Sequence, residues 1–252
     1  MTRWRIVLEY DGAPFAGWQL QEGEPTVQGA VEEALVPLLG HAARVHGAGR
    51  TDAGVHAAVQ VAVFETTTER TAREIRDGLN ARLPPAIACV DAEVADLDFD
   101  PRRSRHTKTY RYTWLTRPAP SPLRRGRVWH IRASLDVRSM HEAAQAIVGT
   151  HDLTSFRAAG DGAEHPVRTI AAASVTESGD EVHLRMKGVG FLRHTVRIVA
   201  GTLYEIGLGE RSPTWFGEVL AARDRTAAGR TAPPEGLLLE RVDYGEGEPS
   251  SS

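Results

Sequence analysis

The sequence predicts an α+β fold made of two similar units, each of the split β-α-β (ferredoxin-like) type. Alternating apolar and polar residues over 3–10 indicate a strand with one buried face. Apolar residues at helical spacing over 27–38 indicate an amphipathic helix. The order strand, helix, strand, strand, helix, strand returns in the second half of the chain. We therefore expect mostly antiparallel sheets, helices on one face, and an active cleft between the two units.

The first unit begins with the strand over 3–10, which ends at the turn-forming pair Asp11-Gly12. Thr26 is the predicted N-cap of the first helix, and Gly40 is its predicted end. The buried faces of this strand and helix are expected to consist of Trp4, Ile6, Leu8, Tyr10, Val27, Ala30, Val31, Ala34, Leu35 and Leu38.

The middle of the first unit contains two further strands, a short one around 44–48 and a longer one over 55–64. The residues between them therefore form a loop at a strand end, where sheets commonly present functional side chains. Thr71 followed by Glu74 is the capping box of a second helix, and 87–94 is the last strand of the unit.

The second half repeats this order in a longer form. Strands are expected at 107–116, 127–132, 168–176, 181–187 and 237–243, and helices at 136–148, 190–207 and 213–222. We predict an N-terminal α+β domain over 1–103, a C-terminal α+β domain over 104–244, and a disordered, small and polar tail over 245–252.

Composition limits the class of protein. With 252 residues, of which 41% are hydrophobic and 25% charged, the chain can bury a sizeable core and is typical of soluble globular proteins. It has no apolar stretch long enough to span a bilayer and no signal-peptide pattern, so we expect a cytoplasmic location. The single cysteine, Cys89, excludes an internal disulfide and a multi-thiolate metal site.

The net charge of −3 conceals an uneven distribution. The basic segment, Pro101–Arg132, contains ten Lys or Arg residues and no Asp or Glu. Arginine pairs with phosphate and stacks on bases, so cations with interleaved aromatic rings favour RNA binding. A general preference for arginine also explains the charge, since Lys108 and Lys187 are the only lysines. The aromatic residues of the basic segment are Tyr110, Tyr112, Trp114 and Trp129.

The run Gly47–Ala57 places one carboxylate, Asp52, beside Arg50 and between glycines. Glycine tolerates positive φ and a close approach of other backbone, which indicates a tight loop that presents Asp52. A carboxylate kept charged by a neighbouring guanidinium can act as a nucleophile or a base. An Asx turn with a surface ion pair explains the same residues without chemistry, so this run alone leaves both interpretations open.

Other chemistries lack their motifs. The chain has no Gly-Lys-Ser/Thr phosphate loop, no dinucleotide-binding glycine pattern, no His-x-x-x-His pair and no Gly-x-Ser-x-Gly elbow, so no cofactor or metal is expected. A two-carboxylate glycosidase would need a second acid, such as Asp11 or Asp152. On the predicted helix 190–207, Arg193 and Arg197 lie one turn apart and can serve a phosphate and a carboxylate, although a solvated face explains them equally well.

Several motifs follow one another along nearly the whole chain: Tyr10-Asp11-Gly12, Gly17-Trp18-Gln19-x-Gln21, Gly49–Ala57, Leu79-Asn80-x-x-Leu83-Pro84, Thr154-Ser155-Phe156, Gly190–His194 and Thr231-Ala232-Pro233-Pro234-x-Gly236-Leu237. In this order they resemble the tRNA pseudouridine synthase A family. The resemblance implies an isomerase that converts uridine to pseudouridine at positions 38–40 in the anticodon stem-loop of tRNA. It also implies a homodimer that needs no cofactor, metal or membrane.

The resemblance implies a catalytic role for three residues. Asp52 would be the nucleophilic aspartate that acts on a flipped-out uridine. Arg197 would be the helix arginine that pairs with the catalytic carboxylate, and Arg50 would help to hold the flipped nucleotide.

Two further residues are implied to bind the substrate. Tyr110 would stack on the target base, and Leu237 would line the pocket. Arg193 is expected to bind the substrate as well, because helical spacing places it one turn from Arg197. The chain departs from the usual family pattern at Arg103, Arg105, Leu153, Thr195 and Leu238. None of these positions is Asp52, Tyr110 or Arg197, so the departures concern RNA contacts more than the chemistry.

Two other function classes fit parts of the sequence. A non-catalytic RNA-binding module would explain the basic segment and the split β-α-β units, but not a glycine-framed carboxylate. A hydrolase using Asp52 would release free uracil instead of rejoining it to the ribose.

Overall fold

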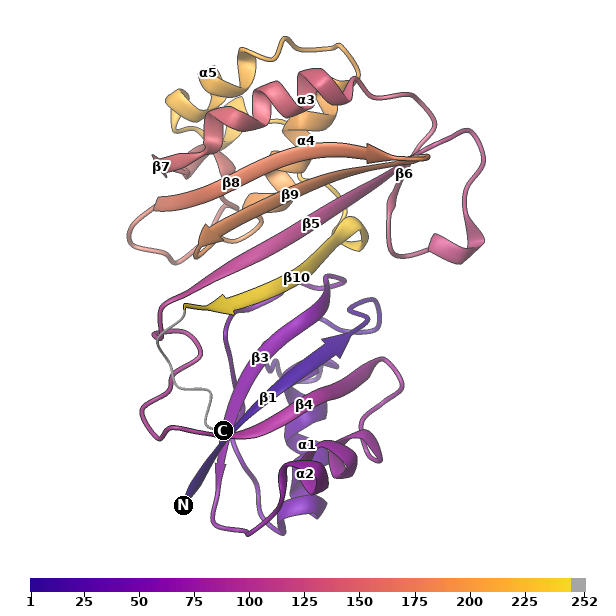
Figure 1. Ribbon diagram of the computed structural model, residues 1–252. Coiled ribbons are helices and arrows are strands. Elements are labelled where there is room, and N and C mark those ends of the chain that lie inside the picture. Colours follow the sequence, from indigo (N-terminus) through magenta and orange to yellow (C-terminus); the bar gives the residue numbers. More distant parts are fainter. Residues whose placement is uncertain (246–252) are drawn as a thin grey trace. The chain divides into compact units, whose positions relative to one another are not determined.

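The computed structural model describes residues 1–245, which form two compact α+β units (Figure 1). Unit 1 consists of Met1–His106 and the C-terminal segment from Leu239 onward, and unit 2 consists of Thr107–Leu238. In each unit the sheet is mostly antiparallel and the helices pack on one side of it, which confirms the predicted fold class.

Unit 1 contains the strand order β4-β1-β3-β10, with the short β2 paired to β3. The final strand, β10, adds to this sheet from Leu239 onward, whereas the sequence-based boundary at 103/104 grouped that strand with the second domain. Of the predicted disordered tail, residues 246–252 lie outside the described residues. The elements are β1 (Thr2–Tyr10), α1 (Val27–Leu39), β2 (His46–Gly47), β3 (His56–Thr66), α2 (Ala72–Asn80), β4 (Ile87–Ala95) and β10 (Leu237–Tyr244).

The first strand and helix form as the sequence predicts. The Thr26 side chain accepts a hydrogen bond from the Gly29 N–H at the start of α1, and Gly40 ends the helix in the left-handed conformation with φ 79°. The apolar side of α1 is buried together with the inner side of β1. Ala30, which was also expected to be buried, is only half-buried. The buried side chains include Trp4, Ile6, Leu8, Tyr10, Val27, Val31, Ala34, Leu35 and Leu38.

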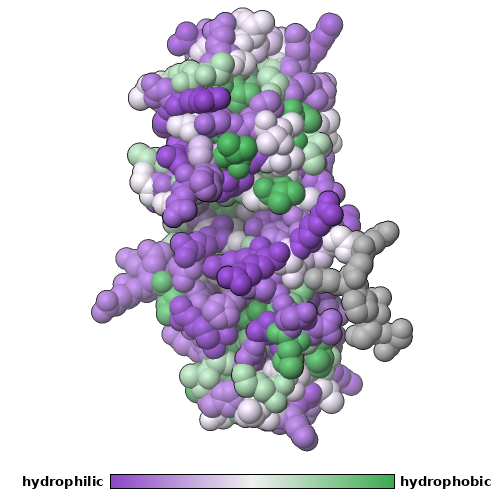
Figure 2. All heavy atoms as spheres, turned by 90° about the vertical axis from the view of Figure 1, so that its left-hand side faces the viewer, coloured by the Kyte–Doolittle hydropathy of each residue, from purple (hydrophilic) through white to green (hydrophobic). Residues whose placement is uncertain are grey.

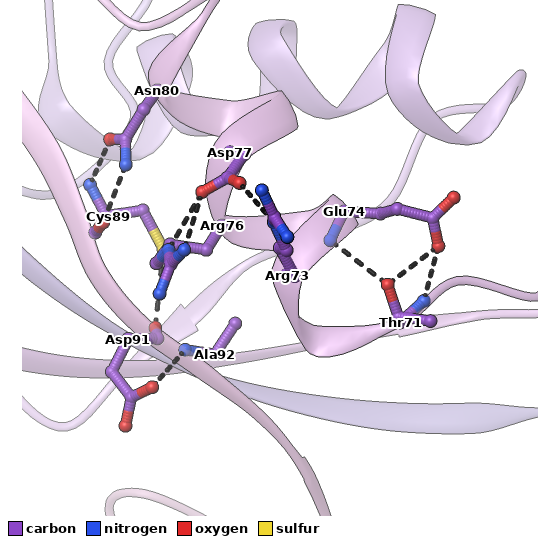
Figure 3. A network of polar contacts seen from close by, with 9 residues as sticks. All are labelled: Thr71, Arg73, Glu74, Arg76, Asp77, Asn80, Cys89, Asp91 and Ala92. Atoms are coloured by element: carbon purple, nitrogen blue, oxygen red, sulfur yellow. Dashed lines mark hydrogen bonds and ion pairs between the residues drawn. The ribbon is translucent and has the colours of Figure 1, made fainter.

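A network of polar contacts joins α2 to β4 (Figure 3). The predicted capping box is present, because the Thr71 hydroxyl accepts from the Glu74 N–H and the Glu74 carboxylate accepts from the Thr71 N–H. At the other end of α2, the Asn80 amide donates to the Cys89 carbonyl and its oxygen accepts from the Cys89 N–H, both at 2.8 Å (Figure 3). Burial raises the pKa of the Cys89 thiol to about 12, so this cysteine stays protonated and inert.

Unit 2 contains the strand order β5-β9-β8-β7, and β6 pairs with β5 in parallel. The strand β7 and the 3₁₀ turns were not predicted. The strands and helices are β5 (His106–Thr116), β6 (Trp129–Ile131), α3 (Val137–Ala144), β7 (Gly149–Asp152), β8 (Val167–Ser178), β9 (Glu181–Val189), α4 (Thr195–Gly207) and α5 (Trp215–Ala222). The 3₁₀ turns are η1 (Pro122–Arg124), η2 (Gln145–Ile147), η3 (Thr154–Phe156), η4 (Arg225–Ala227) and η5 (Pro234–Gly236).

The aromatic residues of the basic segment are mostly core residues of unit 2. Tyr112 and Trp114 are fully buried on β5, and their rings lie 5.0 Å apart. Trp129 packs against Tyr204 of α4 with a centroid distance of 4.5 Å. The expectation that these rings alternate with cations on an RNA-facing surface is therefore not met by Tyr112 and Trp114, because β-strand alternation turns them into the core.

Hydrophilic side chains cover most of the face of each unit shown in Figure 2, where apolar side chains gather only in small groups. None of the helices in the described part of the chain has the length and hydrophobicity needed for a membrane span.

We predict that Asn80→Ala destabilises the protein by about 2–3 kcal/mol, because two hydrogen bonds are lost and the partly buried Cys89 backbone groups lose their partners. The free energy of unfolding in urea measures this loss. Arg73→Gln, at a side chain that is 85% exposed, is the control and changes stability by less than about 0.5 kcal/mol. Equal stabilities of the two variants would contradict the prediction.

Candidate functional site

In unit 1, the Asp52 loop (Gly49–Gly54) lies between β2 and β3, at the strand end where the sequence places it. Asp52 is half-buried, and Arg50 is exposed. Within residues 1–245 Arg50 forms no ion pair or hydrogen bond, so the structure does not show the expected pair between Arg50 and Asp52. The contacts that hold the Asp52 loop are made by other residues of unit 1.

The backbone of the Gly17-Trp18 segment packs against the backbone of the Asp52 loop. The Trp18 N–H donates to the Thr51 carbonyl oxygen at 3.0 Å. Gly17 has φ +106°, and a Cβ atom there would lie 2.7 Å from the Thr51 oxygen and 3.1 Å from the Asp52 carbonyl carbon. Only glycine allows this backbone-to-backbone contact directly beneath the carboxylate.

The supporting segment is itself fixed by α1 and β2. Two N–H groups at the start of α1, from Val27 and Gln28, donate to the carbonyl oxygens of Gly17 and Trp18 at 3.1 and 3.0 Å. The Trp18 ring, which is 1% exposed, covers Gly47 of β2 so closely that a Cβ atom there would meet it at 2.6 Å. The helix start thus satisfies its unpaired N–H groups with the segment that carries the Asp52 loop.

The far side of the loop is held by a turn and by the Asp11-Gly12 pair. The Val55 N–H closes a turn onto the Asp52 carbonyl at 3.1 Å, with Gly54 at φ +76°. A Cβ atom on Gly12 would lie 2.0 Å from the Val55 oxygen, and the Gly12 N–H donates to the buried Nδ1 of His56 at 3.1 Å. Backbone contacts therefore fix both ends of the loop.

In unit 2, Tyr110 lies on β5 opposite Met186 of β9 and is 8% exposed. Phe191, from the connection between β9 and α4, packs its ring edge-on against Tyr110 with a centroid distance of 5.0 Å and an interplanar angle of 79°. This contact favours one orientation of the phenol ring.

The connection Gly190–His194 differs from the predicted helix 190–207. The helix α4 begins only at Thr195, because Gly190 and His194 both adopt left-handed backbone conformations, with φ 69° and 65°. Arg193 therefore lies before the helix and is exposed, and its backbone N–H donates to Asp161 at 3.0 Å. The expectation that Arg193 and Arg197 share one helix face is wrong.

Arg197 is on α4, and the segment that precedes η5 orients it. Its Nε donates to the Ala232 carbonyl oxygen at 2.8 Å, and the Ala232 N–H donates to the Arg197 carbonyl oxygen at 3.0 Å. Gly201, one turn further along α4, makes room for this segment, because a Cβ atom there would lie 1.8 Å from the Arg230 oxygen. The backbone of Ala232 therefore fixes the orientation of the Arg197 guanidinium.

Leu237 begins β10 directly after η5 and is 5% exposed. The preceding turn is anchored by Tyr112, whose hydroxyl donates to the Pro233 carbonyl at 2.9 Å and whose ring leaves no room for a Cβ atom on Gly236. Burial raises the pKa of Tyr112, so this hydroxyl remains a donor at neutral pH. The predicted pocket residue is therefore placed by the same turn that orients Arg197.

A family model described as tRNA pseudouridine synthase matches residues 6–102 and 143–245. A Myxococcus xanthus protein named tRNA pseudouridine synthase A is 48% identical over 252 residues, covering 99% of this chain and 95% of that protein. Its namesake from Geotalea uraniireducens is 43% identical over 244 residues, covering 97% of this chain and all of that protein. The chain belongs to the tRNA pseudouridine synthase family. It is accordingly an enzyme, of the isomerase class.

A solved structure titled "Crystal Structure of a Cbf5-Nop10-Gar1 Complex" aligns with a TM-score of 0.39 and 14% identity, covering 97% of this chain and 50% of that chain. This alignment is too weak to add to the family match.

Within this member of the family, part of the basic segment is engaged in ion pairs. Arg117 pairs with Asp180 at 3.0 Å, and Arg124 pairs with Glu181 at 2.9 Å. Asp180 lies in the turn between β8 and β9, and Glu181 is the first residue of β9. These two arginines therefore hold the connection between β5 and β6 in place and are less available to phosphate than the sequence suggests.

Sequence reasoning located Asp52 but missed most of the residues that support it. Gly17 and Trp18 belong to a recognised motif, yet their role depends on a contact with residues more than thirty positions away. Phe191 gave no separate signal, because an apolar residue in a helical pattern is ordinarily read as core. Among residues 1–245, no group of three or more His, Cys, Asp or Glu side chains is arranged to hold a metal ion.

We predict that Gly17→Ala costs about 2–4 kcal/mol of stability, because a Cβ atom is strained at φ +106° and overlaps the Thr51 oxygen. Its kcat should fall by about tenfold or more, since displacing the Asp52 loop misplaces the carboxylate. Gly23→Ala is a matched control with φ +77° and no atom within 4 Å of a Cβ atom. It should cost only about 1 kcal/mol and leave kcat unchanged. Urea unfolding and steady-state kinetics test both variants.

Proposed function

We propose that this protein isomerises uridine to pseudouridine at positions 38–40 in the anticodon stem-loop of tRNA, with Asp52 as the nucleophile. Membership of the tRNA pseudouridine synthase family supports the reaction and the tRNA substrate. The observation that carries the assignment of Asp52 is its place on a loop whose backbone is fixed on both sides, at Thr51 and at Val55, with the residue half-buried. A carboxylate held on a fixed loop backbone is the geometry that a nucleophile requires.

The reaction needs no electrons from outside. The bond between ribose C1′ and uracil N1 breaks, a bond between C1′ and C5 forms, the C5 proton leaves and N1 gains a proton. An ionised Asp52 can act as the nucleophile at uracil C6 or ribose C1′, or as a base that removes a sugar proton to begin an elimination. The overall isomerisation is the same for the three routes, and the nucleophile assignment applies to the first two.

The remaining roles are those expected from the family resemblance and from the sequence, and the chemistry of each side chain suits its role. Tyr110 stacks on the flipped base and Leu237 lines the pocket, which offsets part of the few kcal/mol needed to unstack a nucleotide. The role proposed for Arg197 is to pair with the catalytic carboxylate, and the hydrogen bond from its Nε to the Ala232 carbonyl oxygen supports a defined orientation of the guanidinium. Arg50 and Arg193 are exposed, which suits contacts with the RNA backbone.

The family resemblance also supports a cytoplasmic enzyme that acts as a homodimer. Both statements remain predictions. Sedimentation velocity of the purified protein would test the dimer.

We predict that Asp52→Asn binds tRNA with nearly wild-type affinity but forms no pseudouridine, because the amide lacks a nucleophilic oxygen of comparable strength. Asp98→Asn is the control, because it makes the same change in charge at an exposed aspartate of unit 1. This variant should retain activity. The assay incubates unmodified tRNA with each variant and measures pseudouridine, free uracil and bound RNA.

The same assay separates the rival functions. Free uracil would identify a hydrolase, and bound tRNA without any product from the wild type would identify a non-catalytic binding module. Substantial pseudouridine formation by Asp52→Asn would refute the nucleophile assignment.

We predict that an anticodon-arm RNA with a single uridine at position 38, 39 or 40 is converted, whereas the same RNA with its uridine elsewhere in the arm is not. Mapping of pseudouridine after incubation measures this selectivity. The affinity should fall steeply with salt, because phosphate contacts release counterions. Equal conversion at positions outside this window would limit the proposal to the isomerisation itself.

A further inference from the structure

Three buried polar side chains meet beneath the Asp52 loop. The Tyr10 hydroxyl of β1 lies 2.8 Å from the Thr51 hydroxyl, so the two share a hydrogen bond. The Gln60 amide of β3 donates to the Gly49 carbonyl oxygen at 2.8 Å and lies 3.5 Å from the Tyr10 hydroxyl. The exposed fractions of Tyr10, Thr51 and Gln60 are 3%, 6% and 0%.

The sheet is irregular where this trio forms. Leu8 of β1 faces Gln60 of β3, but Tyr10, two residues on, faces Ala57, three residues back, so the register shifts between them. An irregularity of this kind re-aims a side chain and is common beside active sites. It occurs where β1 and β3 present the phenol and the amide to the loop.

The trio holds the residues on both sides of Arg50. Gln60 binds the loop backbone at Gly49, and Tyr10 binds the side chain of Thr51, the residue before Asp52. Burial raises the pKa of Tyr10 to about 12, so its hydroxyl keeps its proton throughout the neutral range. The Gln60 Oε1 is buried and has no hydrogen-bond partner within residues 1–245, an arrangement with an energetic cost that favours a functional reason.

We propose that Tyr10, Thr51 and Gln60 are positioning residues that hold the Asp52 loop in its reactive geometry. The inference rests on the proposed role of Asp52 and adds the buried groups through which the sheet acts on that carboxylate. None of the three contacts the substrate. They determine the position of the Asp52 carboxylate. Their loss should therefore lower kcat and leave the affinity for tRNA unchanged.

The test measures kcat, KM for tRNA and the thermal midpoint of unfolding for Thr51→Val, Thr51→Ser and Tyr10→Phe in the full-length protein. Thr51→Val and Tyr10→Phe remove the shared hydrogen bond at nearly constant shape. Each should lower kcat by about tenfold, since a small misplacement of a reacting group is costly. KM should stay within about twofold, because no substrate contact is lost. Thr51→Ser keeps the hydroxyl and should restore most of kcat.

Thr66→Val is the matched control for stability alone. Thr66 is another buried threonine of unit 1, on β3, and its hydroxyl is hydrogen-bonded to His41 at 2.9 Å. This variant should lower the unfolding midpoint about as much as Thr51→Val but leave kcat unchanged. If both variants lose kcat in proportion to stability, the trio is merely structural and the inference is overturned.

The double variant Tyr10→Phe/Thr51→Val adds a second test. Because both changes remove the same bond, the double variant should be no slower than the slower single variant. Multiplied losses, an unchanged kcat in Thr51→Val, or a Thr51→Ser variant as slow as Thr51→Val would each overturn the inference. Activity of Asp52→Asn would instead overturn the proposed function, so the two failures are distinguishable. Tyr10→Phe keeps the ring in place and maintains the test if Thr51→Val does not fold.

Discussion

The hydrogen bond from the Trp18 N–H to the Thr51 carbonyl oxygen, made over Gly17, is the contact on which the Asp52 loop depends. One such bond contributes only about 0.5–1.5 kcal/mol, so it cannot by itself hold a charged side chain in place. It succeeds because its donor belongs to a segment already fixed by the first turn of α1 and by the packing of the Trp18 ring. The packing of α1 against the core thus determines where the Asp52 loop lies.

Unit 2 contains a similar backbone contact at a glycine, on the helix α4. The segment before η5 approaches the backbone of α4 at Gly201, and the reciprocal bonds between Arg197 and Ala232 follow from that approach. In both units a glycine permits a backbone contact that any Cβ atom would prevent. The position of a functional side chain is then set by main-chain atoms that the fold already holds in place.

Local signals in the sequence predicted the elements that local interactions determine. The Thr26 cap and the Thr71–Glu74 capping box need only residues within one helical turn, and both are present in the structure. The predicted start of α4 was wrong. The segment before Thr195 has the spacing of a helix, but its conformation is fixed by contacts with residues some thirty positions earlier in the sequence. The position of Asp52 at a strand end was likewise predictable, but its support by Gly17 was not, since nothing local to either residue indicates the other.

The left-handed conformation of His194 shows how such a distant contact can place a functional group. A non-glycine residue at φ 65° costs about 1–3 kcal/mol and persists only where its surroundings impose it. Here the neighbouring residue, Arg193, is held through both backbone groups, its N–H by Asp161 and its carbonyl by the Ala158 N–H at 2.9 Å. Because the left-handed His194 precedes the first residue of α4, Phe191 lies outside the helix, where it packs against Tyr110. The strain therefore serves the orientation of the phenol ring, because a helix continued back to Gly190 would carry Phe191 away from that contact.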